Sequence, residues 1–128
     1  MPPRYTLTVA SLLMAAAVAL GALGAHALTT RLTPDALAIW RTAVTYHAWH
    51  ALALLAIGVL QRLTPAPRGV ALAATLLVAG IVLFSGSLYL LALGAPRGWG
   101  YLTPAGGVAF IAGWLVLAAT LAAGARRA

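Results

Sequence analysis

The chain has 128 residues, of which 63% are hydrophobic and only 7% are charged, and its mean hydropathy is +1.00. These proportions exclude an ordinary soluble domain, whose surface needs far more charge, and they are typical of a protein embedded in a bilayer. The net charge of +7 comes from arginines that stand singly between apolar runs, which predicts no nucleic-acid partner, and the lack of cysteine excludes disulfides and thiolate metal sites.

Four apolar segments follow one another along the chain, and each predicts a transmembrane helix. They cover residues 5–28, 43–60, 70–93 and 106–123. A helix of about 20 residues, within a range of about 17–25, crosses the hydrocarbon core, so each segment is long enough. Apolar and polar residues do not alternate, which argues against the strands of a barrel. The sequence therefore predicts an all-α, four-helix integral membrane bundle that forms a single domain over residues 1–128.

The second helix is predicted to begin before the hydrocarbon, at Pro34. Thr33 and Pro34 combine an N-cap hydroxyl with a proline in the first helical position, and Asp35 follows in the first turn, where the helix dipole favours a carboxylate. The same Leu-Thr-Pro triplet recurs at 102–104, before the fourth apolar segment. It predicts a helix start of the same kind there.

Residues 34–45 are expected to form an interfacial extension of the second helix. Trp40 and Tyr46 are predicted to lie at headgroup level, while Arg41 extends its guanidinium outward to water. The arginines also give an orientation. Arg4, Arg62, Arg68, Arg126 and Arg127 fall on one side of the membrane, and Arg31, Arg41 and Arg97 on the other. This bias predicts that both termini are cytoplasmic.

In this orientation the histidines fall in the outer halves of the spans, together with Tyr46, Ser85, Ser87 and Tyr89. The inner halves hold only hydroxyl side chains apart from Tyr5 at the edge, namely Thr6, Thr8, Ser11, Thr75 and Thr120, which can bond carbonyls of their own helices. A proton or ion pathway needs ionisable groups through the midplane, and no acidic residue occurs within any span. This asymmetry weighs against a transporter.

The candidate polar cluster comprises His26, Tyr46, His50, Ser87 and Tyr89. In one interpretation these side chains hydrogen-bond between neighbouring helices and fix their register. In the other they bind a metal, haem or quinone, since three imidazoles suit such chemistry and His47 and His50 share a helix face. A metal-binding histidine usually donates its second ring N–H to a carboxylate or another acceptor. Asp35 is the only carboxylate side chain, and it lies about three turns from His47. We therefore predict no metal and no cofactor.

Small residues predict close helix packing at Gly24, Gly86, Gly106, Gly107 and Gly113. The alternative is a crevice that admits a quinone, a lipid or a partner helix where side chains are missing. No Ser–His–Asp set, phosphate loop or carboxylate pair is present, so nothing in the sequence supports an enzyme.

Four stretches together resemble a known family: GALGAHAL at 21–28, LTPDALAIWRTAVTYHAWHALALL at 32–55, LFSGSLYLLAL at 83–93 and LTPAGGVAFIAGW at 102–114. In these stretches the chain is similar to the small membrane-protein family that includes the bacterial YgdD- and YwdK-type proteins and a vertebrate relative. The resemblance covers nearly the whole chain. It implies a four-helix protein of the bacterial inner membrane, and it implies no activity, because the family is one of unknown function.

The family pattern carries onto Gly24, His26, Tyr46, His50, Ala51, Leu52, Ser87, Tyr89, Pro104, Gly106, Gly107, Gly113 and Trp114. His47 departs from it, since relatives commonly have glutamine or another polar residue there, which weakens a metal site built on His47 and His50. The resulting hypothesis is a non-enzymatic structural or accessory membrane component. Its expected partners are the lipid bilayer and either a second copy of the chain or another membrane protein.

Overall fold

The computed structural model describes residues 1–63 and 67–125, and every regular element in these ranges is helical. The elements are α1 (Pro3–Ala25), α2 (Pro34–Leu63), α3 (Arg68–Gly80), a π-helical turn η1 (Ile81–Ser85), α4 (Gly86–Ala92), a 3₁₀ turn η2 (Arg97–Tyr101) and α5 (Leu102–Ala125). Because α3, η1 and α4 run on without a break, the described chain forms four rods long and apolar enough to cross a membrane. The predicted all-α, four-helix architecture is confirmed.

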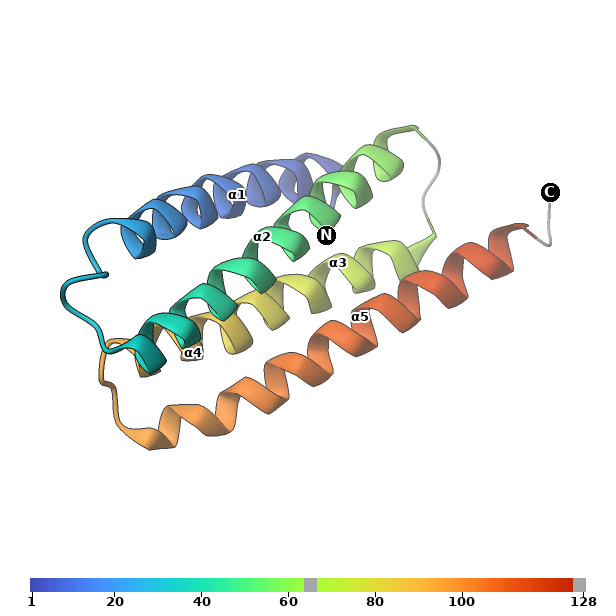
Figure 1. Ribbon diagram of the computed structural model, residues 1–128. Coiled ribbons are helices and arrows are strands. Elements are labelled where there is room, and N and C mark those ends of the chain that lie inside the picture. Colours follow the sequence, from blue (N-terminus) through green and yellow to red (C-terminus); the bar gives the residue numbers. More distant parts are fainter. Residues whose placement is uncertain (64–66, 126–128) are drawn as a thin grey trace.

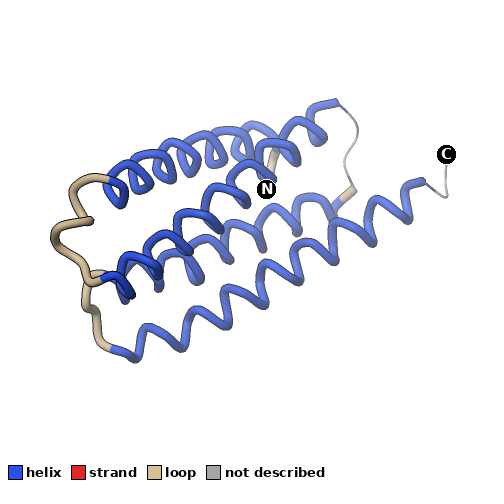
Figure 2. The backbone as a smooth tube through the Cα atoms, viewed as in Figure 1, coloured by secondary structure: helices blue, strands red, loops and turns tan. Residues whose placement is uncertain are grey.

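The rods run side by side in alternating directions (Figures 1 and 2). α1 packs chiefly on α2, α5 packs chiefly on α3 and η1, and α2 contacts η1, α4 and α3. α2 and α3–α4 therefore form the inside of the bundle, with α1 and α5 at its two sides (Figure 1). The α1–α2 and α4–α5 connections lie at the same end, called the loop end below.

Two apolar clusters form the interior. The larger cluster includes Leu54 of α2, Leu77 of α3 and Phe110 of α5, and the smaller cluster lies at the loop end around Trp40 and Leu28. Lipid tails are as apolar as these side chains, so the clusters hold the helices together by packing rather than by escape from water. Packing of this kind depends on close approach, which gives the glycines described below their importance.

The predicted start of α2 is confirmed. The backbone N–H of Ala36 donates to the Thr33 hydroxyl over 3.2 Å, Pro34 begins the helix, and Asp35 lies in its first turn. The Leu-Thr-Pro triplet at 102–104 behaves differently. α5 already begins at Leu102 as a continuation of η2, so Thr103 lies inside the helix and its hydroxyl is free to bond a neighbouring rod.

Trp40, which is predicted to lie at headgroup level, packs between α1 and α2. Its side chain is only 2% exposed, and its indole N–H donates to the Leu20 carbonyl of α1 over 2.9 Å. The reason is Gly24, which leaves room for the indole between α1 and α2. Tyr46, the other predicted interfacial aromatic, is 36% exposed.

The hydroxyl groups of the inner halves satisfy themselves as predicted. Thr6, Thr8, Ser11, Thr75 and Thr120 each donate to the carbonyl four residues earlier on their own chain, over 2.7 to 3.2 Å. The hydrogen bonds that these five hydroxyls donate therefore do not join different helices. Most of the polar contacts that do so involve residues described in the next subsection.

Candidate functional site

His50 lies on the buried face of α2 and uses both ring nitrogens. Its Nδ1 is 2.7 Å from the Tyr46 carbonyl oxygen, and its Nε2 accepts the indole N–H of Trp114 on α5 over 3.3 Å. A carbonyl can only accept and an indole N–H can only donate, so the contacts fix a neutral imidazole protonated at Nδ1. The ring also stacks on Phe110, with centroids 3.5 Å apart and planes 13° apart. His50 thus joins α2 to α5.

His47 lies one turn earlier and faces a different neighbour. Its Nδ1 is 3.2 Å from the hydroxyl of Tyr89 on α4, and which of the two donates depends on the tautomer. Tyr89 in turn packs against Trp40, with ring centroids 4.7 Å apart. The His47 side chain is 4% exposed and its Nε2 has no hydrogen-bond partner, although its ring interacts with the Leu13 backbone of α1.

Ser87 joins α4 to the start of α5. Its hydroxyl bonds the Phe84 carbonyl over 2.9 Å and lies 2.7 Å from the Thr103 hydroxyl. The π-helical turn Ile81–Ser85 directly precedes it, and such a turn inserts one extra residue into the helix. The rotation that follows places Ser87 toward α5 and Tyr89 toward α2. Within the turn, Ser85 is fully buried and its hydroxyl has no partner.

His26 is not brought together with the other four members of the predicted polar cluster. α1 ends at Ala25, so His26 lies in the turn that follows, and it is exposed. The hydrogen bond recorded at its carbonyl comes from the Thr29 hydroxyl over 2.6 Å. Among the described residues, no hydrogen bond or ring contact joins the His26 imidazole to Tyr46, His50, Ser87 or Tyr89.

The polar residues therefore form two groups, and a separate contact between Ser87 and Thr103, rather than one cluster. The α5-facing group is centred on His50, with Tyr46, Phe84, Phe110 and Trp114 around it. The α1-facing group contains His47, Tyr89 and Trp40. Each group links α2 to other rods. Within the described residues, no set of three histidine or acidic side chains converges in a way that could hold a metal ion.

Two of the predicted packing glycines meet side chains of a neighbouring helix. A Cβ at Gly24 would lie 2.6 Å from Cδ1 of Trp40, and a Cβ at Gly113 would lie 2.8 Å from Cδ2 of Leu77. Real Cβ atoms essentially never come this close to another heavy atom. Glycine at both positions therefore allows the helices to approach to their observed separation.

Gly106 makes the closest approach of this kind to a neighbouring backbone. A Cβ there would lie 2.7 Å from Cα of Phe84 and nearer still to the Phe84 amide nitrogen, at the π-helical turn. The other predicted positions differ. Nothing lies within 4 Å of a Cβ at Gly86, and a Cβ at Gly107 would make only ordinary contact, 3.9 Å from Phe84.

His47 was not among the predicted site residues, although the spacing of buried residues along α2 could have identified it. Trp40, Ala43, His47, His50 and Leu54 recur every three or four residues and are all buried on one face of α2. Gly80 was also missed. A Cβ there would overlap the ring of Phe110, so Gly80 makes room for the aromatic side chain that stacks on His50.

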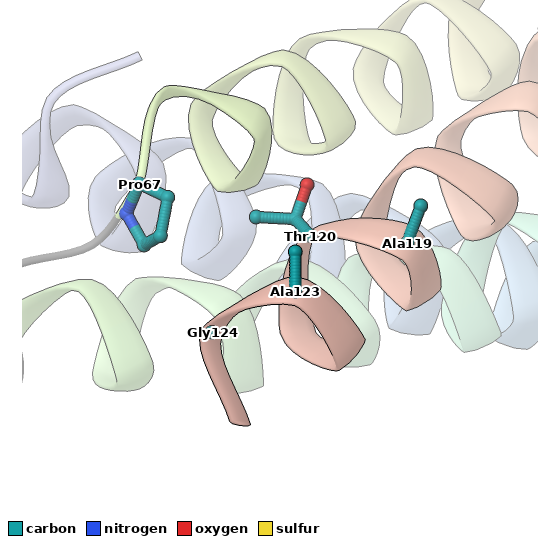
Figure 3. A pocket seen from close by; sticks show the side chains of 5 residues that line it. All are labelled: Pro67, Ala119, Thr120, Ala123 and Gly124. Carbon is teal, nitrogen blue, oxygen red and sulfur yellow. The ribbon is translucent and has the colours of Figure 1, made fainter. Parts of the chain in front are cut away.

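Two hollows away from the loop end are lined mainly by apolar residues. One of about 380 Å³ lies between the start of α3 and the end of α5, where Thr120 lies across from Pro67 (Figure 3). It is lined by Pro67, Ala119, Thr120, Ala123 and Gly124 (Figure 3), and the Thr120 hydroxyl already donates to the Val116 carbonyl. A second hollow of about 220 Å³ between α2 and α5 is lined by apolar residues including Trp114.

These features define a class: a small integral membrane protein of four helices, in which a few polar side chains bond between helices. A family model described as "Protein of unknown function (DUF423)" matches residues 20–107. The chain belongs to this family, which confirms the resemblance seen in its motifs. No solved structure matches the chain.

The relatives are bacterial membrane proteins of the same kind. The chain is 50% identical over 101 residues to a UPF0382 membrane protein of Staphylococcus saprophyticus, covering 79% of this chain and 82% of the relative. It is 45% identical over 101 residues to the UPF0382 membrane protein YwdK of Bacillus subtilis, with 79% and 82% covered. It is 38% identical over 121 residues to the UPF0382 inner membrane protein YgdD of Escherichia coli, with 91% and 88% covered.

Proposed function

We propose that this protein is a non-enzymatic structural or accessory component of the membrane, in which His50 holds α2 to α5 rather than binding a metal or cofactor. One observation carries the proposal: both nitrogens of His50 are engaged, one by the Tyr46 carbonyl and the other by the Trp114 indole. A metal or haem iron needs a nitrogen lone pair, and the Nε2 lone pair of His50 already accepts a hydrogen bond. A ligand at His50 would first have to separate α5 from α2.

The expected location is the bacterial inner membrane with both termini in the cytoplasm. The Escherichia coli relative is named an inner membrane protein. The arginine bias of five against three supports the orientation, although Arg126 and Arg127 lie outside the described residues. Lipid covers the exposed apolar surfaces of α1 and α5, and a second copy or another membrane protein is the expected protein partner.

A double-mutant cycle with Trp114 measures how much the His50–Trp114 contact contributes to the stability of the protein. We expect His50→Ala to lower the free energy of unfolding by about 1–2 kcal/mol in detergent, since membrane hydrogen bonds average about 0.6 kcal/mol and the stacked ring is also lost. Trp114→Phe removes the indole N–H and keeps an aromatic ring. The two changes should show a coupling energy of about 0.5–1 kcal/mol when combined. Reversible unfolding followed by circular dichroism measures all four proteins.

The same wild-type preparation distinguishes packing from cofactor binding. We expect a colourless protein without stoichiometric metal, measured by elemental analysis and by its absorption spectrum. Stoichiometric metal or a haem absorption band, abolished by His50→Ala, would contradict the proposal. Additive effects of His50→Ala and Trp114→Phe would show that the His50–Trp114 contact does not join the helices.

A further inference from the structure

A groove between α1 and α2 at the loop end has no assigned role. It has a volume of about 440 Å³, and its lining includes Gly21 and Gly24 of α1 together with Trp40, Arg41 and Thr45 of α2. The small residues of α1 leave the groove open, and Arg41 is the one charged residue in its lining. Since Trp40 packs against Gly24 near the end of α1, the groove lies where the first span is expected to leave the membrane.

Arg41 has no anionic partner within the described chain. The sequence holds a single acidic side chain, Asp35, which lies six residues earlier and about 120° around the same helix. The hydrogen bond recorded at Arg41 is made by its backbone carbonyl, which accepts from the Thr45 hydroxyl over 2.9 Å. The described residues therefore leave the guanidinium available to an anion from outside the chain.

The other polar groups of the groove are already occupied. The Trp40 indole N–H donates to the Leu20 carbonyl, and the Thr45 hydroxyl donates to the Arg41 carbonyl. The guanidinium of Arg41 is therefore the main donor that the groove offers to a ligand. Its planar N–H groups match two oxygens of a phosphate, and charge-assisted hydrogen bonds of this kind are among the stronger ones.

We propose that this groove binds one phospholipid, with the phosphodiester on Arg41 and an acyl chain over Gly21 and Gly24. The positive charge of Arg41 favours an anionic ligand. The chain carries a net charge of +7, and the groove lies at the membrane boundary, where lipid phosphates are the abundant anions. A lipid with a net negative charge, such as phosphatidylglycerol, binds more tightly than zwitterionic phosphatidylcholine. Gly21 and Gly24 would then make room for a lipid acyl chain as well as for close packing of α1 on α2.

The test uses the full chain in neutral detergent micelles, with phosphatidylglycerol or phosphatidylcholine added and bound lipid counted by native mass spectrometry. Arg41→Gln should weaken phosphatidylglycerol binding about tenfold or more, as expected for loss of a charge-assisted pair. Arg31→Gln is the matched control, because Arg31 lies in the α1–α2 connection outside the groove. It should retain binding close to wild type.

Gly21→Leu tests the groove without altering any charge. A Cβ at Gly21 would lie 3.4 Å from Val44, at the limit of ordinary contact, and the rest of the leucine side chain should occupy the groove that Gly21 lines. It should weaken lipid binding while Arg41 remains. Equal losses in Arg41→Gln and Arg31→Gln, or unchanged binding in Gly21→Leu, would overturn the proposal. So would a lipid-free dimer that Gly21→Leu dissociates, since a second copy would then occupy the groove. If Arg41→Gln does not fold, Arg41→Ala against Arg31→Ala gives the same comparison, because both remove the charge.

Discussion

Gly106→Ala is expected to destabilise the protein by about 2–3 kcal/mol, although it adds a single methyl group. The methyl carbon would lie 2.7 Å from Cα of Phe84 and closer to its amide nitrogen. A backbone cannot rotate away as a flexible side chain can, so α5 must move off the π-helical turn. Overpacking of this kind typically costs about 1–3 kcal/mol. Reversible unfolding in mixed micelles, followed by circular dichroism, measures the loss.

Gly107→Ala is the matched control, because it makes the same chemical change one residue later on α5. Its methyl carbon would lie 3.9 Å from the Phe84 ring, which is ordinary contact. Alanine in a helix interior is favoured over glycine by about 0.5–1 kcal/mol, so this variant should be as stable as wild type or slightly more stable. Equal stability of the two variants would show that α5 does not approach Phe84 as closely as the structure has it.

Trp40→Ala is expected to cost about 3–5 kcal/mol, as for other buried aromatic residues that are truncated. The indole is 2% exposed, fills the space above Gly24, contacts Tyr89 and donates to the Leu20 carbonyl. Its loss would leave a cavity between α1 and α2. The free energy of unfolding should therefore fall, and α1 should become more accessible to protease at the loop end.

Two variants separate packing from other causes. Trp40→Phe keeps most of the ring contact and loses the hydrogen bond, so it should cost only about 0.5–1.5 kcal/mol. Trp49→Ala truncates the same residue type at a position that is 63% exposed, and it should cost little. A Trp49→Ala loss as large as that of Trp40→Ala would contradict the assignment of Trp40 to the interior.

The number of helices and their membrane-spanning character could be predicted, because a chain inside a lipid bilayer can adopt few kinds of secondary structure. A backbone in hydrocarbon must satisfy its own hydrogen bonds, so long apolar runs become helices. The start of α2 was also predictable, since Thr33 and Pro34 act locally and do so in the structure. The same triplet at 102–104 gave a different result, because η2 delivers a chain that is already helical to Leu102.

Which polar residues contact one another could not be predicted from the sequence. Whether His26 faces Tyr46 depends on where α1 ends and how it is rotated, and α1 ends before His26. Gly86 was predicted as a packing position, but the sequence did not indicate the π-helical turn at Ile81–Ser85 that precedes it. That extra residue determines which rods Ser87 and Tyr89 meet, and single-sequence spacing does not reveal it.

In the proposed role, His50 is a neutral imidazole whose Nδ1 bonds the Tyr46 carbonyl and whose Nε2 accepts from Trp114 on α5. Nitrogen-15 NMR of the protein with labelled histidine reports this protonation state, with His50→Asn used to assign the signals. We expect the His50 signals to show a protonated Nδ1 and an unprotonated Nε2 that accepts a hydrogen bond. A proton on Nε2, or a metal-type shift of either nitrogen, would contradict it.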